Sequence, residues 1–224
     1  MEDTVIVGVC ATGRVAYDCL LAGGLADDVA GFVYASETVA QCEHTWDGLP
    51  VLGTLADLEK LKDAGITQAL AAVGENAQRE RLCETLSRAG FELINAVHPT
   101  AAITRGVRMG RNVIVGPCAA VGVGTELGDG VFLNTSSSVD HDCVLGECVH
   151  VCPGTHLAGN VKVGRRSWIG IGSSVIQGIT IGADVFVGAG SVVVRDLPDG
   201  VLAYGSPARG VRKLEDDERG RIIT

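Results

Sequence analysis

The 224-residue sequence predicts a small α/β unit followed by a long parallel β-helix, because its two parts differ in hydrophobic period. From residue 97 to 198 an apolar residue, nearly always aliphatic, returns at every sixth position through seventeen hexads, without an insertion or deletion. Before residue 97, short apolar runs alternate with segments of helical spacing. A period of six fits neither an α-helix, whose period is 3.6, nor a sandwich strand, whose period is 2.

Each hexad predicts one short strand whose first residue points inward, and this repeat is the sequence signature of a parallel β-helix. Three hexads make one triangular coil, so residues eighteen apart should lie in neighbouring strands, roughly 4.8 Å from each other. The second position is Gly in nine of the seventeen hexads, and we expect these glycines to supply corner conformations. This hexad form is a left-handed β-helix, an exception to the right-handed crossover rule.

The first unit is predicted to be a small Rossmann-like parallel sheet. Strands are expected at 4–9, 31–34 and 69–73, and helices at 15–20, 55–64 and 76–89. Gly65 and Gly90 stand where the last two helices should stop. Alternating strands and helices imply a parallel sheet whose ligands bind beyond the carboxyl ends of the strands. The expected domains are therefore residues 1–96, the β-helix 97–210 and a charged tail 211–224.

Composition argues against some binding partners and indicates the cellular compartment. A formal net charge of −9 argues against nucleic acid or an anionic membrane, because phosphate binding depends on clustered Lys and Arg. The sequence shows no apolar run near 18 residues and no charged-then-apolar leader, so we expect a cytoplasmic protein. None of the eight cysteines forms a C-x2-C pair, which favours reduced thiols over disulfides or a metal site. Cys143 occupies a small fifth position and is expected to point inward.

Two strand ends that carry glycine indicate a ligand site in the first unit. The turn at 8–13 leads into a helix whose first N–H groups could hold a phosphate. Gly74 follows the strand 69–73 in the same way. The turn does not have the G-x-G-x-x-G spacing, and alone it fits a tight structural turn equally well. Together the two strand ends favour a nucleotide site.

Two neighbouring hexads carry polar residues where the repeat favours small ones. They contain Asn134, Asp140, His141 and Asp142 within nine residues, and the plain alternative is a solvated polar corner. Gly159 follows His141 by eighteen residues, so the next coil should bring a backbone N–H without side-chain cover close to the imidazole. A base beside an uncovered amide donor suits acyl transfer.

Aromatic residues also stack in the predicted register. Phe132, His150, Trp168 and Phe186 occupy sixth positions at intervals of eighteen residues. Because the sixth position points outward, we expect another subunit or a ligand to bury this aromatic ladder, which suits a symmetric oligomer. The alternative is a ladder that is simply exposed.

At these positions the sequence resembles the left-handed β-helix acyltransferases that N-acetylate nucleotide-linked amino sugars or O-acetylate sialic acid. The resemblance covers nearly the whole chain, and its motifs are specific in their order rather than singly. They are the 8–13 turn, Val73-Gly74, Val97-His98-Pro99, Asn134-Thr135, His141-Asp142, Gly146-Glu147, His150, Leu157-Ala158-Gly159-Asn160-Val161, Gly188-Ala189-Gly190-Ser191-Val192-Val193 and Gly205-Ser206-Pro207-Ala208-Arg209.

The resemblance implies a homotrimer with acetyl-CoA along the β-helix between subunits, a UDP-type amino sugar in the first unit and no metal. His141 would be the general base, Asp142 would raise its basicity, and Gly159 N–H would stabilise the oxyanion in a site that includes Asn134. Acetyl-CoA contacts are implied at His150, Ile171 and Ala189. Sugar-nucleotide contacts are implied at Thr12, Gly13, Arg14 and Gly74.

Two departures from the family concern the substrate. Arg14 stands where the family often has His, and Tyr34-Ala35-Ser36 stands where it often has acidic residues. An Arg can pair with a phosphate or carboxylate through two hydrogen bonds, so the identity of the sugar stays open.

Other functions remain alternatives. Sugar O-acetylation is one, and a non-catalytic sugar-binding scaffold, which thiol release from acetyl-CoA would exclude, is another. A zinc carbonic anhydrase-like β-helix would need His141, His150 and His156 to converge near 2 Å from the metal, yet His150 and His156 are expected on adjacent faces. A nucleotidyltransferase would need a much larger first domain with a basic phosphate loop.

Overall fold

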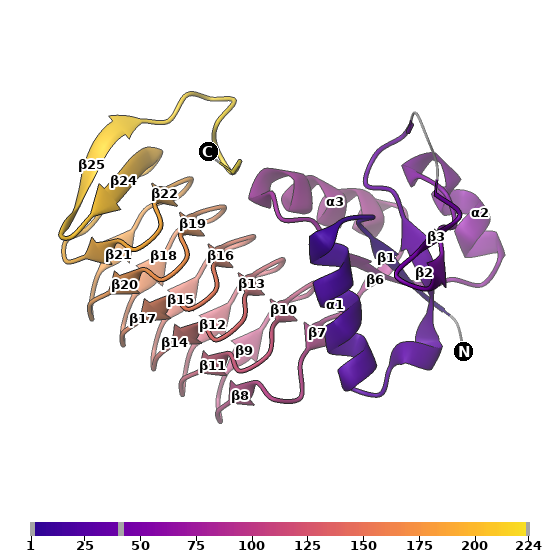
Figure 1. Cartoon of the computed structure of the whole chain (residues 1–224), viewed down its shortest axis with the longest axis horizontal. Helices are drawn as coiled ribbons and strands as arrows, with labels where there is room; N and C mark the ends of the chain where they lie inside the picture. Colours follow the sequence, from indigo (N-terminus) through magenta and orange to yellow (C-terminus); the bar gives the residue numbers. More distant parts are fainter. Residues whose placement is uncertain (1–2, 40–42, 223–224) are drawn as a thin grey trace.

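The computed structural model describes residues 3–39 and 43–222, and Cys42 lies outside them. An α/β unit leads into a triangular parallel β-helix that ends in an antiparallel hairpin (Figure 1). Both predicted architectures are therefore confirmed. Within the described part of the chain, no helix is long and apolar enough to cross a membrane.

The α/β unit is built on a parallel sheet with the strand order β2-β1-β5-β6. Its elements are β1 (Thr4–Val7), α1 (Ala11–Ala22), η1 (Ala26–Asp28), β2 (Val29–Val33), β3 (Thr45–Trp46), β4 (Leu49–Pro50), η2 (Leu55–Asp57), α2 (Leu58–Asp63), β5 (Gln68–Ala71), α3 (Asn76–Arg88) and β6 (Glu92–Leu93). The first strand ends at Val7, two residues earlier than expected. The next residue, Gly8, has φ 153°, and a Cβ on it would lie 2.2 Å from Ala72 O, so this position requires glycine. The residues expected as a turn before residue 15 instead form the first turn of α1.

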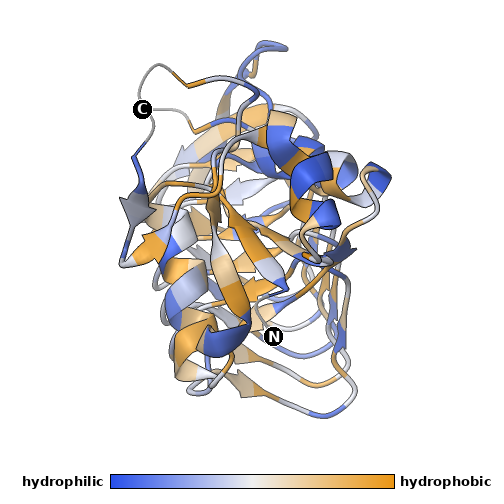
Figure 2. Cartoon of the chain, turned by 90° about the vertical axis from the view of Figure 1, so that its right-hand side faces the viewer, coloured by the Kyte–Doolittle hydropathy of each residue, from blue (hydrophilic) through white to orange (hydrophobic). Residues whose placement is uncertain are grey.

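The sheet is buried on both faces, which explains its continuous apolar runs. On one face, Val5 and Val7 pack with apolar residues of α2 and α3. On the other, Ile6 and Phe32 pack with α1 and with Phe132 of the β-helix. In Figure 2 the strands are mainly hydrophobic and the helices carry hydrophilic residues on their outer sides. The two units therefore share a core.

The β-helix has three faces, each a parallel sheet. The first face contains β7 (Ala96–Val97), β10 (Ile114–Val115), β13 (Phe132–Leu133), β16 (His150–Val151), β19 (Trp168–Ile169) and β22 (Phe186–Val187). The second contains β8 (Ala102–Ile103), β11 (Ala120–Val121), β14 (Ser138–Val139), β17 (His156–Leu157), β20 (Ser174–Val175) and β23 (Val192–Val193). The third contains β9 (Arg108–Met109), β12 (Glu126–Leu127), β15 (Val144–Leu145), β18 (Lys162–Val163) and β21 (Thr180–Ile181).

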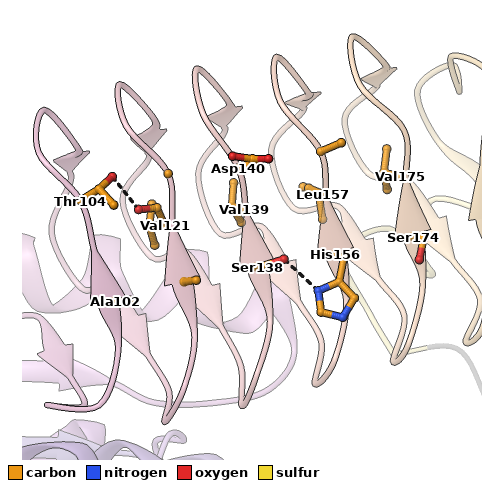
Figure 3. A pocket seen from close by; sticks show the side chains of 13 residues that line it. Ala102, Thr104, Val121, Ser138, Val139, Asp140, His156, Leu157, Ser174 and Val175 are labelled. Atoms are coloured by element: carbon orange, nitrogen blue, oxygen red, sulfur yellow. Dashed lines mark hydrogen bonds between the residues drawn. The ribbon is translucent and has the colours of Figure 1, made fainter.

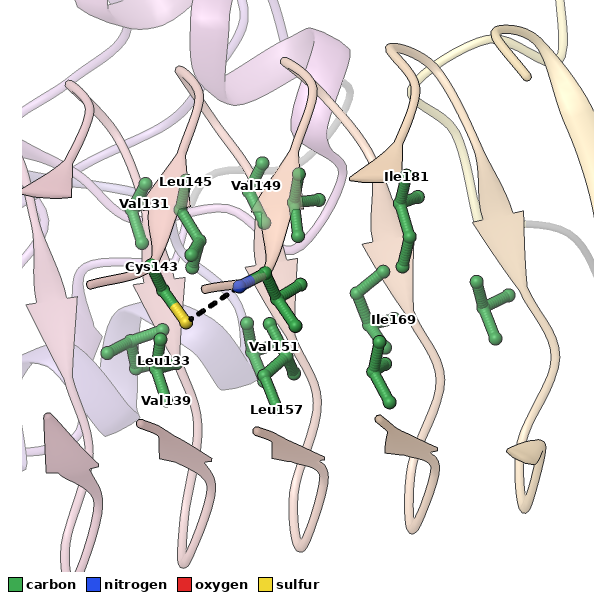
Figure 4. Close-up of a cluster of buried hydrophobic side chains, with 14 of the residues drawn as sticks. Val131, Leu133, Val139, Cys143, Leu145, Val149, Val151, Leu157, Ile169 and Ile181 are labelled. Carbon is green, nitrogen blue, oxygen red and sulfur yellow. Dashed lines mark hydrogen bonds between the residues drawn. The ribbon is translucent and has the colours of Figure 1, made fainter. Parts of the chain in front are cut away.

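The eighteen-residue register is confirmed, as in the pairing of Leu133 with Val151 and of Val151 with Ile169. First-position residues fill the interior (Figure 4). The buried fifth-position hydroxyls of Thr125, Thr155, Ser167 and Ser173 donate to corner carbonyls of the next coil, as in the bond from Thr125 Oγ1 to Asp140 O at 2.7 Å. Hydrophobic packing and hydroxyl bonds thus both repeat with the coil.

The second-position glycines have another cause than expected. They do not adopt positive φ; the left-handed residue is the fourth of the hexad, as at Gly124 (φ 76°) and Asp142 (φ 56°). A Cβ on Gly122 would lie 2.5 Å from His141 N in the next coil. The expectation of corner conformations at the second position is wrong, and close stacking between coils selects glycine there.

The stack changes at its last coil, which is two residues shorter than the others. Phe186 pairs with Leu202, sixteen residues on. The chain then forms an antiparallel hairpin of β24 (Val201–Gly205) and β25 (Ala208–Lys213), so the boundary expected at residue 210 falls inside a strand. Beyond the hairpin, residues 214–222 return to the N-terminus of α3, where Ala77 N donates to Gly220 O at 2.9 Å.

A single chain already buries most of the aromatic ladder. Phe132 is 2% exposed and His150 is 4% exposed, and their ring centroids lie 4.4 Å apart. The α/β unit lies on this face, with Phe132 in the same cluster as Phe32. The expectation that another subunit or a ligand buries the ladder is wrong for Phe132, His150 and Phe186, all of which the chain itself buries. Trp168 stays half-buried.

Arg79 of α3 links the two units and is fully buried. Its guanidinium donates to Gly130 O at 2.7 Å and to Cys148 O at 3.0 Å in the β-helix. It also donates to Val73 O, Gly74 O and Asn76 Oδ1 in its own unit, at 2.9, 3.2 and 2.8 Å. One side chain therefore ties the loop after β5 to two successive coils.

Candidate active site

His141 lies at the corner that follows β14, between the second and third faces. Its Nδ1 is 2.9 Å from Asp142 Oδ2, and its side chain is 49% exposed. Asp142 is the left-handed residue of this corner, and Asp is one of the few side chains that adopt that conformation readily. The local backbone thus places the carboxylate against the imidazole.

The imidazole stacks on the next coil as the register predicts. A Cβ on Gly159 would lie 2.4 Å from His141 Nε2 and 2.5 Å from Cε1. Any larger residue at position 159 would displace the ring, so glycine is required here for space. The ring edge that carries Nε2 therefore lies beside backbone with no side-chain cover.

The surrounding carboxylates favour a basic imidazole. The hydrogen bond with Asp142 raises the pKa of His141 above its ordinary value of 6.5, and the charge of Asp140 acts in the same direction. Because Asp142 accepts the Nδ1–H, the neutral ring keeps Nε2 unprotonated. This arrangement can accept a proton from a ligand at Nε2.

Cys143 follows this dyad but is a structural residue. It is fully buried, and its Sγ lies 3.2 Å from Ala158 O and 3.4 Å from Val161 N (Figure 4). Burial raises the pKa of its thiol, so it does not supply a reactive thiolate. The prediction that Cys143 points inward is confirmed.

Asn134 and His150 pair with each other rather than with His141. Asn134 Nδ2 donates to His150 Nε2 at 3.2 Å, and Asn134 Oδ1 accepts from Thr135 N at 2.8 Å. Burial lowers the pKa of His150 well below its ordinary range, so this ring is neutral and can accept. His150 thus faces the α/β unit, whereas Asn134 lies at the corner between the first and second faces.

Ile171 and Ala189 lie at that same corner, on successive coils. Gly190 N donates to Ile171 O at 2.8 Å, and both Ile171 and Ala189 are exposed. The second face separates this corner from the one that holds His141 and Gly159. One chain therefore does not bring the predicted acetyl-CoA contacts together with the predicted base.

The second face is lined by small and apolar side chains. It forms a groove of about 440 Å³ (Figure 3). Outward residues along it are Ala102, Ala120, Ser138, His156 and Ser174. His156 Nδ1 lies 2.8 Å from Ser138 Oγ. By contrast, the third face carries Lys162 and an ion pair between Arg108 and Glu126, and the α/β unit covers the first face.

A second cavity, of about 480 Å³, opens beyond the carboxyl ends of β1, β2 and β5. Its lining residues are Gly8, Val9, Cys10, Ala11, Thr12, Tyr34, Ala35, Ser36, Val73, Gly74, Glu75, Gln78 and Ile222. The N-cap residue of α1, Cys10, makes no side-chain capping bond, so the start of this helix can offer N–H groups to an anion. Thr12 and Gly74 face each other here: a Cβ on Gly74 would lie 3.3 Å from Thr12 Oγ1.

The other two predicted sugar-nucleotide contacts lie elsewhere. Gly13 is a packing residue, since a Cβ on it would lie 1.9 Å from Gly8 O. Arg14 Nε donates to Asp47 Oδ1 at 3.1 Å and lines a neighbouring cavity of about 440 Å³ that also contacts Thr135 of the β-helix. The four predicted residues thus divide between one shared cavity, one packing position and one adjoining cavity.

The histidines considered for zinc lie apart. His141 is at a corner, His150 is buried on the first face and His156 is exposed on the second. Among residues 3–39 and 43–222, no group of three or more His, Cys, Asp or Glu is arranged to hold a metal ion.

Sequence reasoning missed Asp47, Arg79 and Ile222. Asp47 and Ile222 come from segments without a periodic pattern, which therefore give no signal of what they contact. Arg79 lies in an expected helix, but a helical pattern cannot show that a charged residue is buried.

Comparison with known proteins indicates the family of the chain. Residues 160–195 match the family model of bacterial transferase hexapeptide repeats (six repeats). None of the curated protein sequences compared with the chain matches it.

Three solved structures cover nearly the whole chain. A histidine-to-asparagine variant of perosamine N-acetyltransferase from Caulobacter crescentus, in complex with CoA and GDP-perosamine, is 41% identical, with a TM-score of 0.87 over 94% of this chain and 97% of that one. The acetyltransferase domain of PglB from Neisseria gonorrhoeae, in complex with acetyl coenzyme A, is 34% identical, with a TM-score of 0.85 over 93% and 98%. WeeI from Acinetobacter baumannii, at 24% identity and a TM-score of 0.76 over 93% and 99%, shares the fold.

Proposed function

The chain belongs to the hexapeptide-repeat sugar N-acetyltransferases, and we propose that it transfers the acetyl group of acetyl-CoA to the amino group of a nucleotide-linked amino sugar. The observation that carries this proposal is the His141–Asp142 pair above Gly159, found in a chain that matches a perosamine N-acetyltransferase over 94% of this chain and 97% of that one. A helix N-terminus beside an open cavity in the α/β unit supports a diphosphate ligand.

The transfer is direct, with His141 as general base. Its Nε2 takes the proton that the sugar amine loses as the nitrogen attacks the thioester carbonyl carbon. Gly159 N–H stabilises the negative charge on the carbonyl oxygen. The C–S bond then breaks, the thiolate leaves, and His141 returns the proton to sulfur. Asp142 holds the ring in the tautomer that leaves Nε2 free.

The active site is formed between subunits of a homotrimer. Ile171 and His141 lie at opposite corners of the second face, so two chains packed side by side on this face would bring Ile171 of one chain near His141 of the other. The small side chains of that face permit a close approach of another copy. Asn134, held through His150, lies at the corner that would meet the neighbouring His141.

A cytoplasmic location is supported by the cysteines. Those at positions 10, 19, 83, 118, 143, 148 and 152 are free thiols, as expected for a reducing compartment.

The acceptor is expected to be a GDP-linked amino sugar of the perosamine type. Thiol release from acetyl-CoA should be measured with GDP-perosamine, with UDP-linked amino sugars and with free sialic acid. GDP-perosamine should give the highest kcat/KM, because the 41% identical relative binds it. Preference for a UDP-linked amino sugar would change the nucleotide but keep the reaction. Acetylation of sialic acid alone, or no thiol release, would contradict the proposal.

The oligomer can be tested on the second face. Ala120→Arg should convert the trimer into monomers, since it places a long cation on a face of small residues. The matched change Thr180→Arg, on the exposed third face, should leave the trimer intact. Light scattering at micromolar concentration reports both. A monomeric wild-type protein would contradict the shared active site.

A further inference from the structure

The C-terminal segment 214–222 returns from the far end of the β-helix to the α/β unit (Figure 1). Leu214, 5% exposed, starts it with a hydrogen bond from its N to Gly200 O at 2.7 Å. Glu218 then accepts from Arg212 at 2.6 Å and from Glu215 N at 2.8 Å. These bonds give the segment a defined path; we call it the C-terminal strap.

The strap is anchored at the start of α3. Gly220 O accepts from Ala77 N at 2.9 Å and so caps that helix. Gly220 has φ 70°, and a Cβ on it would lie 2.9 Å from Ala77 Cβ, so both conformation and space require glycine. Arg221 Nε lies 3.6 Å from Glu75 Oε1. The strap therefore meets the loop after β5 at fixed points.

Ile222 follows this anchor and lines the 480 Å³ cavity. Its Cδ1 lies 3.8 Å from the position of a Cβ on Gly74, and its side chain is 48% exposed. An aliphatic side chain at the rim of a ligand cavity can cover apolar parts of the ligand when the site is filled.

The hydrogen-bonding and charged groups around the cavity indicate whether the diphosphate or the nucleoside of the ligand lies beside the strap. The Ala77 N–H at the start of α3 is already used by Gly220, and the Arg221 guanidinium on that side lies against Glu75, at 3.6 Å. A diphosphate is therefore disfavoured beside α3 and favoured at the start of α1, where the N-cap residue Cys10 makes no side-chain capping bond. The uncharged nucleoside is left for the side of the cavity that holds Gly74 and Ile222.

We propose that the C-terminal strap forms a wall of the nucleotide-sugar site and that Ile222 packs against the nucleoside. This inference rests on the proposed function, because it needs a nucleotide in the cavity. It assigns a substrate-binding role to residues that lie more than a hundred positions after the α/β unit in the sequence.

The test is whether a change in the strap weakens binding of the nucleotide sugar without weakening binding of acetyl-CoA. Ile222→Ala should raise the Kd for GDP, or for UDP if the wild type binds UDP more tightly, about fivefold, since roughly half of an isoleucine contact is lost. The KM for the nucleotide sugar should rise by a similar factor, with kcat and the KM for acetyl-CoA unchanged. Gly220→Val, which pushes the strap away from Ala77, should give the same split.

Two variants control the result. Ile222→Leu should bind the nucleotide as the wild type does, because it keeps the apolar contact. Val211→Ala removes an equally exposed aliphatic side chain from β25, outside the cavity, and should change nothing.

If the wild-type enzyme is active and Ile222→Ala keeps the wild-type Kd for the nucleotide and KM for the nucleotide sugar, the proposed role of the strap is contradicted and the proposed function is not. A wild-type protein that binds neither GDP nor UDP and releases no thiol would overturn the proposed function, and the strap with it.

Discussion

Replacing His141 by alanine is expected to lower kcat about 10²–10⁴-fold, the usual contribution of a positioned general base. The side chain is half exposed at a corner and fills no core position, so the variant should fold and still bind acetyl-CoA. Thiol-release kinetics with saturating substrates measure the loss. His98→Ala is the matched control, because His98 also lies in a corner of the repeat but on the first coil. A folded His141→Ala enzyme that keeps more than about a tenth of wild-type kcat, with chemistry limiting, would exclude His141 as the base.

The pH dependence of kcat/KM is a second test of the His141–Asp142 pair. His141 acts only when neutral, so kcat/KM should rise with pH through the pKa of His141. Because Asp142 raises that pKa, the ascending limb should lie above the ordinary value of 6.5. Asp142→Asn keeps the left-handed backbone but removes the charge, so it should shift the limb to lower pH and lower the plateau. A limb at the same pH in both enzymes would assign it to another group, such as the substrate amine.

Replacing Arg79 by methionine is expected to lower the free energy of unfolding by about 3–5 kcal/mol. The change leaves five acceptors without the guanidinium, and each buried acceptor left unpaired costs about 1–3 kcal/mol. Relief of the buried charge offsets part of this loss, as its lowered pKa indicates.

Urea unfolding at one fixed protein concentration measures this change. Arg81→Met, on the exposed side of the same helix, should stay within about 0.5 kcal/mol of the wild type. A loss below about 1 kcal/mol for Arg79→Met would show that water replaces the lost donors.

The repeat made the β-helix predictable in detail. A period of six fixes which residues point inward, and three hexads per coil place His141 over Gly159 from arithmetic alone. The dyad was also readable, because Asp142 is the next residue. The inward-facing residues, the stacking of His141 on Gly159 and the His141–Asp142 pair could therefore all be predicted from the sequence.

Contacts between the units were not predictable in the same way. The sequence showed that the Phe132–His150 ladder needs a cover, but not that the α/β unit of the same chain supplies it. Arg14 was predicted to contact the sugar nucleotide; its ion pair with Asp47 could not be predicted, because Asp47 lies in a segment without a period. Second-position glycines are selected by stacking distance, a tertiary property that φ preferences do not reveal.

The hairpin at the end of the β-helix is expected to limit self-association. A stack of parallel strands presents an open edge of unpaired N–H and C=O groups, and such an edge can template further strands from other molecules. On the first face β25 runs antiparallel to β24 and ends the stack of parallel coils. Its exposed Arg209 and Lys213 add like charges along that edge, which disfavours the approach of a second copy. Removing β25 should therefore turn a discrete enzyme into one prone to end-to-end fibre growth.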